Sequence, residues 1–338
     1  MAGSGTAHLR DDALLRVEHL VVEYPTRSGT VHAVSDVSFD IAKGETLGLV
    51  GESGCGKSTV AKSILQLPPP TSGSVTMEGE SLVGRSPSDL RRLRSRLQIV
   101  FQDPISSLNP RRSVKKIVAE GLEVRKGLSK EEIRARVEET LESVGIDPQA
   151  VGDRLPREFS GGQCQRICIA RALVLEPQLV VCDEPVSALD VSVQAQILNL
   201  LRDMKDRYGL TLFFIAHDLA VVKSISDRIA VMYLGKMCEV AESEALYATP
   251  LHPYTRALLD AVPEPDPEAP PAVGELVGEI PSPMRPPSGC RFRTRCPRAQ
   301  ARCAADEPKL REAQPGHFVA CHFPLEPDSA AGDDREVP

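Results

Sequence analysis

The amino-acid sequence predicts an α/β protein built on a parallel sheet covered by helices. Short and nearly continuous apolar runs, typical of strands buried on both faces, lie at residues 97–101, 179–182 and 212–216. A further strand pattern at 44–51 passes through a glycine-rich loop into a helical pattern at 58–67. Strands that alternate with helices are characteristic of α/β folds.

Two more elements have clear local signals. Residues 14–24 alternate between apolar and polar side chains, which predicts a strand. A helix is predicted over 129–144, where Ser129 and Glu132 have the spacing of a capping box and Gly145 suits the position after the helix. Its apolar face consists of Ile133, Val137, Leu141 and Val144.

Composition excludes several classes of protein. The 338 residues are 41% hydrophobic and 26% charged, as in ordinary globular proteins, and the net charge of −7 argues against a nucleic-acid partner. The longest uninterrupted apolar stretch, residues 229–234, is too short to span a membrane. Because the N-terminal residues contain no apolar secretion signal, we expect a cytosolic protein with reduced thiols.

The chain divides by composition. Residues 14–262 carry the α/β pattern, and 263–288 hold nine prolines and are expected to form a linker. Residues 289–324 form a short Cys- and Arg-rich extension, and the polar tail at 325–338 is expected to be disordered.

The loop after the strand at 44–51 matches the phosphate-binding pattern G-x-x-x-x-G-K-[ST]. Glycines let backbone N–H groups approach phosphates, Lys57 supplies a positive charge, and Ser58 offers a hydroxyl to Mg²⁺. Cys55 is either a small filler or a reactive thiol at a helix N-terminus. The expected nucleotide-binding residues of this loop are Gly51, Ser53, Gly54, Cys55, Gly56, Lys57, Ser58 and Thr59.

Two acids follow the apolar run at 179–182. The carboxyl end of a parallel strand lies beside the phosphate loop in such sheets. We therefore expect Asp183 to hold Mg²⁺ and Glu184 to polarise the attacking water, although the pair could instead cap the next turn.

The segment Ser160-Gly161-Gly162-Gln163 resembles the signature motif of ABC-transporter ATPases. Other motifs of that family follow the expected order over about residues 14–260. They are an adenine-stacking aromatic at Tyr24, a Q-loop glutamine at Gln102, a D-loop ending at Asp190 and a switch histidine at His217. Tyr24 could alternatively be a core aromatic, and His217 an ordinary histidine at a sheet end.

The resemblance implies a fold and a set of roles. The fold is a P-loop ABC cassette: a RecA-like core with an antiparallel β subdomain and a helical subdomain at about 103–175. Glu184 and His217 would be catalytic, and Gln102 would serve both nucleotide and metal. The signature residues Ser160 to Gln163, at a helix N-terminus, would bind the γ-phosphate of ATP held by a second subunit.

Three segments resemble ATPase subunits of oligopeptide and dipeptide importers, a group that includes nickel importers: residues 101–111, His252–Leu258 and the cysteine-bearing extension. In that family, two ATPases, identical or not, dock beneath two permease subunits. An external binding protein delivers the peptide to the permease. The chain would then lie on the cytoplasmic face of the membrane, with 103–150 receiving the permease, unless this part is a helical insertion without that role. A soluble ABC ATPase acting on DNA or ribosomes, a nickel importer ATPase and a regulatory ATP-binding subunit remain the alternatives.

Four cysteines gather in the extension: Cys290, Cys296, Cys303 and Cys321. A segment with so few apolar residues is expected to need a cross-link, and disulfides are disfavoured in the cytosol. Four thiolates suit Zn²⁺ or a [4Fe–4S] cluster, and the wide spacing favours the cluster. Four unligated thiols are the third possibility.

Overall fold

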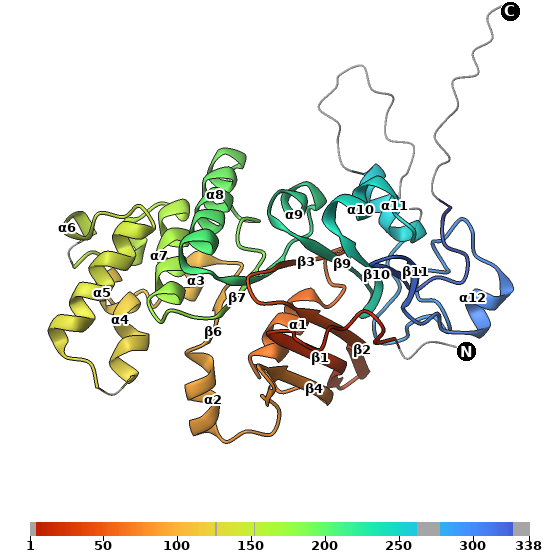
Figure 1. Cartoon of the computed structure of the whole chain (residues 1–338), viewed down its shortest axis with the longest axis horizontal. Helices are drawn as coiled ribbons and strands as arrows, with labels where there is room; N and C mark the ends of the chain where they lie inside the picture. Colours follow the sequence, from red (N-terminus) through yellow and green to blue (C-terminus); the bar gives the residue numbers. More distant parts are fainter. Residues whose placement is uncertain (1–4, 126, 152, 262–277, 327–338) are drawn as a thin grey trace, which may run out of the picture.

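The computed structural model describes residues 5–125, 127–151, 153–261 and 278–326. Most of the expected linker and nearly all of the expected tail lie outside these residues. In Figure 1, helices α4 to α7 form one end of the molecule, strands and helix α1 the middle, and the C-terminal segment (residues 278–326) the other end.

A mixed eight-stranded sheet forms the centre. Its five strands from β9 to β6 run parallel to their neighbours, whereas β10, β12 and β11 continue the sheet in antiparallel pairs. The strand predictions at 44–51, 97–101, 179–182 and 212–216 are confirmed to within two residues at each end. In spatial order the strands are β11 (Arg311–Gln314), β12 (His317–Val319), β10 (Lys236–Glu242), β9 (Arg228–Tyr233), β3 (Thr46–Val50), β8 (Thr211–Ile215), β7 (Leu179–Asp183) and β6 (Leu97–Val100).

A second, antiparallel sheet has four strands in the order β2 (Gly29–Ile41), β1 (Leu15–Thr26), β4 (Ser72–Met77) and β5 (Glu80–Ser81). The strand predicted at 14–24 is its β1. The two sheets share apolar contacts, since Phe39 of β2 stacks on Phe213 of β8 at 5.1 Å between ring centroids. Strand β2 also lies near the start of α1, since a Cβ on Gly56 would lie 2.2 Å from the carbonyl oxygen of Ala33.

Outside the helical end of the molecule, the described residues form α1 (Lys57–Ile64), α2 (Pro87–Arg94), α8 (Val191–Tyr208), α9 (Leu219–Ile225), α10 (Ser243–Ala248), α11 (Pro253–Asp260) and α12 (Ala301–Ala305). The helical end contains α3 (Pro104–Ser107), α4 (Val114–Val124), α5 (Lys130–Ser143), α6 (Pro148–Val151), a 3₁₀ turn at Pro156–Glu158 and α7 (Gly161–Leu173).

Helix α5 confirms the helix predicted over 129–144. Ser129 and Glu132 form both hydrogen bonds of a capping box. Gly145 follows the helix with φ of +75°, a left-handed conformation that glycine adopts without strain.

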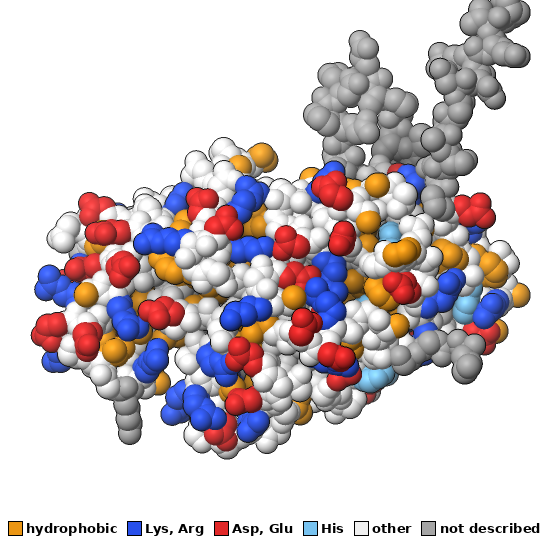
Figure 2. Space-filling view, viewed as in Figure 1, with side chains coloured by type: hydrophobic (Ala, Val, Ile, Leu, Met, Phe, Trp, Pro, Cys, Tyr) orange, Lys and Arg blue, Asp and Glu red, His pale blue; other side chains and the backbone are white. Residues whose placement is uncertain are grey.

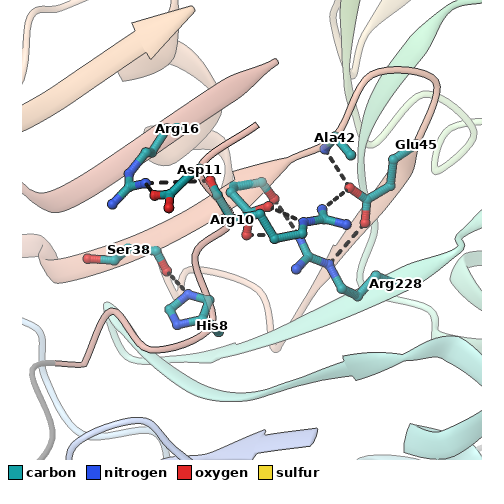
Figure 3. A network of polar contacts seen from close by, with 9 residues as sticks. His8, Arg10, Asp11, Arg16, Ser38, Ala42, Glu45 and Arg228 are labelled. Carbon is teal, nitrogen blue, oxygen red and sulfur yellow. Dashed lines mark hydrogen bonds and ion pairs between the residues drawn. The ribbon is translucent and has the colours of Figure 1, made fainter. Parts of the chain in front are cut away.

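A buried ionic network holds the N-terminal residues against both sheets (Figure 3). Asp40 of β2 is fully buried and accepts from Arg10 Nε at 2.6 Å and from Arg228 Nη2 at 3.1 Å. Glu45 pairs with the same two arginines. Each buried carboxylate therefore has two cationic partners, as a charge removed from water requires.

The C-terminal segment shares the core of the cassette. Strand β12 pairs with β10, and the side chains of Phe292, Leu310 and Val319 are buried. Glu239 of β10, itself fully buried, lies 2.6 Å from Nε2 of His317. The expectation that this segment needs a cross-link to be held was therefore wrong, because packing on β10 supplies the missing core.

Two surface features bear on the setting of the protein. In the described residues, no helix is long and apolar enough to cross a membrane. Figure 2 shows Lys and Arg side chains interspersed with Asp and Glu over the face in view, without a patch of one sign.

Candidate nucleotide site

The phosphate loop connects β3 to α1 and is wedged between two strands. Gly51 has φ of +155°, and a Cβ there would lie 2.0 Å from the carbonyl oxygen of Met232 in β9. Gly56 has φ of +108°, and its Cβ would lie 2.2 Å from the carbonyl oxygen of Ala33 in β2. Only glycine fits both places, so the loop can approach a phosphate closely while its backbone is held. Ser53 and Gly54 lie at its exposed tip.

Lys57, the first residue of α1, is almost completely buried. Its Nζ donates to the carbonyl oxygens of Gly51 at 2.6 Å and Glu52 at 3.2 Å. The same Nζ lies 3.7 Å from Oε1 of Glu184. The ammonium group is thus positioned inside the loop, where it can pair with phosphate oxygens.

Ser58 and Asp183 bring the loop and the end of β7 together. Ser58 Oγ donates to Asp183 Oδ1 at 2.8 Å, and burial raises the pKa of the Asp183 carboxyl, an effect that the Ser58 hydrogen bond opposes. A buried carboxylate beside a hydroxyl, next to a phosphate loop, is a donor set that suits Mg²⁺. The two residues fit the predicted metal role.

The Glu184 carboxylate is contacted by side chains from three other motifs. Its Oε2 accepts from Gln102 Nε2 at 3.0 Å and lies 3.3 Å from Nδ1 of His217, while Oε1 faces Lys57. Its backbone has φ of +48°, a conformation that costs energy in a non-glycine residue and is often found at functional sites. The structure therefore brings together four residues that the sequence had placed in one site.

The exposure of Tyr24 and of Cys55 decides between the two roles that the sequence left open for each residue. The Tyr24 ring is 36% exposed on the β1–β2 hairpin, so it is not a core aromatic and is free to contact a ligand. Cys55 is 3% exposed, and burial raises the pKa of its thiol to about 11. A thiol that stays protonated is a poor nucleophile, so the interpretation of Cys55 as reactive was wrong. Thr59 lies half-buried in the first turn of α1.

The signature residues begin α7 as predicted. Ser160 and Gln163 form both hydrogen bonds of a capping box, and both side chains are exposed. Gly162 packs against α8, since a Cβ there would lie 2.7 Å from Val193 Cγ1; Gly161 has more room. Asp190, exposed, is the N-cap of α8. Within the described residues, no hydrogen bond or ion pair joins the signature to the phosphate loop of the same chain.

Sequence reasoning missed the residues behind the phosphate loop. Arg295 binds the Glu52 carboxylate with both Nη atoms, at 2.6 and 3.1 Å, and Tyr254 Oη accepts from the Glu52 backbone N–H at 2.8 Å. The segment His252–Leu258 was recognised only as a family feature. An arginine 243 positions away from its partner gives no local signal.

The four cysteines of the C-terminal segment line a single pocket. Burial raises the pKa of Cys290, Cys296 and Cys321, that of Cys321 to about 11, and neighbouring cysteines of the set reinforce each shift. In the described residues, however, no group of three or more His, Cys, Asp or Glu is arranged to hold a metal ion. The geometry thus gives no support to the predicted cluster or to zinc.

The site combines a phosphate loop, an acid at the end of β7 with a second acid directly after it, and a glutamine and a histidine that meet at one carboxylate. Together with the capped Ser-Gly-Gly-Gln helix, these features define an ATPase of the ATP-binding cassette class. Comparisons with known proteins agree. Residues 34–187 match the family described as ABC transporter, and residues 238–303 match the C-terminal region of the oligopeptide/dipeptide transporter family.

Sequence relatives show to which group of ABC ATPases the chain belongs. A peptide import ATP-binding protein of Brucella ovis is 53% identical over 93% of this chain and 98% of its own length. The oligopeptide transport ATP-binding protein OppF of Escherichia coli is 51% identical over 91% of this chain and 95% of its own. The chain belongs to the family of peptide-transporter ATP-binding proteins, whose cassette hydrolyses ATP.

Solved structures show the same cassette. One from Clostridium perfringens, part of an ABC transporter complex, has a TM-score of 0.62 and 32% identity, covering 70% of this chain and 92% of that one. A dimeric cassette in a post-hydrolysis state with ADP and phosphate has a TM-score of 0.62 and 28% identity, covering 68% and 98%. Neither comparison supports an action on DNA or ribosomes.

Proposed function

We propose that this chain is the subunit that hydrolyses ATP to drive import of oligopeptides or dipeptides through a membrane permease. The observation that carries the proposal is the convergence of Gln102, His217 and Lys57 on Glu184, in a chain more than 50% identical to peptide-import ATPases along most of its length.

Hydrolysis proceeds by in-line attack of water on the γ-phosphate. Glu184 orients that water and accepts its proton, while Gln102 and His217 hold the carboxylate and contact the water and the γ-phosphate. Ser58 and Asp183 would hold Mg²⁺, which neutralises phosphate charge when bound. Lys57 stabilises the negative charge that develops on the transferring group, and the exposed Tyr24 ring stacks on adenine.

The active form is a head-to-tail dimer. Ser160 to Gln163 leave helix amides exposed at the N-terminus of α7, and nothing in this chain's described phosphate loop bonds to them. A second cassette, identical or not, therefore supplies the signature to each nucleotide, and Asp190 lies at the contact. Release after hydrolysis follows from the loss of γ-phosphate contacts.

The helical subdomain (residues 103–175) transmits this motion to two permease subunits on the cytoplasmic face of the membrane. Ile105 of α3, three residues after Gln102, is 62% exposed, which suits a contact with a partner. A peptide-binding protein outside the cell delivers the substrate.

The cysteine pocket is proposed to hold a [4Fe–4S] cluster, with zinc as the alternative. The proposal rests on the four cysteines that line one cavity. As placed, the described residues include no group arranged to hold a metal ion, and burial favours protonated thiols, so a cluster would require the cysteines to move closer together and lose their protons. Its role would be structural, since nothing in the described residues indicates a partner for electron transfer.

The function is tested by reconstituting the chain with its permease and binding protein in vesicles. We expect ATP-dependent accumulation of labelled tri- or tetrapeptide. Accumulation of Ni²⁺ without peptide would move the assignment to a nickel importer. ATP hydrolysis that does not respond to the permease would contradict transport.

A further inference from the structure

Glu52 is the second residue of the phosphate loop. Its side chain and its backbone N–H are both bound by residues that follow strand β10 in the chain. Its carboxylate receives two hydrogen bonds from Arg295, and its backbone N–H donates to Tyr254 Oη. Its carbonyl oxygen, on the other side, accepts from Lys57 Nζ. One residue of the loop therefore links the C-terminal segment directly to the lysine that binds phosphate.

The groups that hold Glu52 are packed against one another. Arg295 is 9% exposed, and its guanidinium carbon lies 5.8 Å from the ring centroid of Tyr233. The Tyr233 ring packs edge-on against Tyr254 at 4.7 Å and against Phe292 at 5.2 Å. A paired arginine–carboxylate contact fixes direction as well as distance, so this aromatic cluster determines where Glu52 lies.

The Arg295 side chain is positioned by a turn between two cysteines of the pocket. The Arg295 N–H donates to the Phe292 carbonyl at 2.9 Å, and the Arg293 N–H to the Cys290 carbonyl at 3.1 Å. Arg295 immediately precedes Cys296. The turn therefore positions the Arg295 guanidinium, which in turn contacts the phosphate loop at Glu52.

We propose that Arg295 is a positioning residue for the phosphate loop, so that the C-terminal segment sets the affinity of the cassette for ATP. The inference rests on the proposed ATPase function. Without Arg295 the loop loses a two-point hold, and the Glu52 carboxylate is left unpaired close to the phosphates, where it repels them. Both effects weaken ATP binding while leaving the groups around Glu184 in place.

The test measures ATP affinity of the full-length protein by calorimetry, without the permease. Arg295→Met is expected to weaken ATP binding about 3- to 30-fold, the range of coupling through one positioning contact. Arg293→Met is the matched control, because the Arg293 guanidinium bonds Ser288 within the segment. This control should keep wild-type affinity. Wild-type affinity in Arg295→Met would overturn the proposal.

A double-mutant cycle separates positioning from general destabilisation. In a Glu52→Gln background, Arg295→Met should change ATP affinity less than about twofold, because the charge it neutralises is gone. Equal losses in both backgrounds would contradict the route through Glu52. In the assembled transporter, Arg295→Met should raise the KM for ATP more than it lowers kcat.

Arg295→Lys serves if the methionine variant does not fold. Lysine keeps the charge but cannot make the paired contact, so an affinity loss of about threefold is expected and an unchanged affinity contradicts the proposal. A wild-type chain that binds no ATP would instead refute the proposed function, which keeps the two failures distinguishable.

Discussion

Gln102 donates a hydrogen bond of 3.0 Å to Glu184, although the two residues are 82 positions apart. The bond joins the end of β6 to the end of β7, two parallel neighbours in the central sheet. Gln102 lies two residues before α3, the first helix of the helical end, and bonds the carboxylate proposed to orient water. This contact is therefore where we propose that hydrolysis is coupled to motion of the helical end.

Glu184→Gln is expected to retain ATP binding and lose most turnover. The amide keeps the shape of the side chain and can still bond Gln102, but it cannot accept a proton from water. General-base removal lowers rates by about 100-fold or more. Phosphate release by the assembled transporter measures this loss, and nucleotide retention by the variant shows the trapped closed dimer. Turnover at the wild-type rate would refute the role of Glu184.

Ser160→Ala is expected to abolish most hydrolysis in the assembled transporter with little change in ATP affinity of the isolated chain. In the proposed head-to-tail dimer, the Ser160 hydroxyl contacts the nucleotide bound by the partner subunit and not the nucleotide of its own chain. Gly162 is a less clean target, because any side chain there would press on Val193.

Ser129→Ala is the matched control for Ser160→Ala. Ser129 forms the same capping box on α5, and either substitution costs about 1 kcal/mol of helix stability. Equal losses of activity in both variants would mean that Ser160 acts only as a cap. Loss of ATP binding by monomeric Ser160→Ala would contradict the arrangement across two subunits.

Local signals explain which parts of this site were predictable. Lys57, Ser58 and the Ser160 capping box are specified by short motifs, and the apolar runs before Asp183 and His217 predicted the strands that carry them. The Glu52–Arg295 contact and the addition of β11 and β12 to the sheet depend on packing between residues far apart in the chain. Neither of these two features produces a hydrophobic periodicity or a sequence motif, so neither could be predicted from the sequence.

The cysteine pocket gives a visible test. Anaerobically purified protein is expected to be brown, to absorb broadly near roughly 400 nm, and to lose this colour in Cys296→Ser. Cys168→Ser is the control, since Cys168 lies buried in α7, outside the pocket. Colourless protein with stoichiometric zinc, or without metal, would contradict the cluster and leave the ATPase assignment intact.

Arg228→Leu is expected to reduce the free energy of unfolding by about 3 kcal/mol. It removes one of the two cations that pair with the buried Asp40 carboxylate, and breaking a buried pair typically costs this much. Arg16→Ala is the control, because the Asp11 side chain with which Arg16 pairs is fully exposed; it should cost at most about 1 kcal/mol. Urea unfolding measures both, and equal effects would refute the importance of burial.

Stability is expected to fall as pH drops below about 6.5, in part because of His252. Burial lowers the pKa of this histidine to about 4, so the unfolded chain binds a proton between about pH 4 and 6.5 that the folded chain does not. The unfolded state is therefore favoured in that window, by roughly 1 kcal/mol at pH 5.5 for this one group. Nδ1 of His252 accepts from the Tyr254 N–H at the start of α11, and asparagine can replace this cap. His252→Asn should thus lose less stability than wild type between pH 7.5 and 5.5 in urea unfolding. An identical pH dependence in both proteins would show that His252 is not responsible.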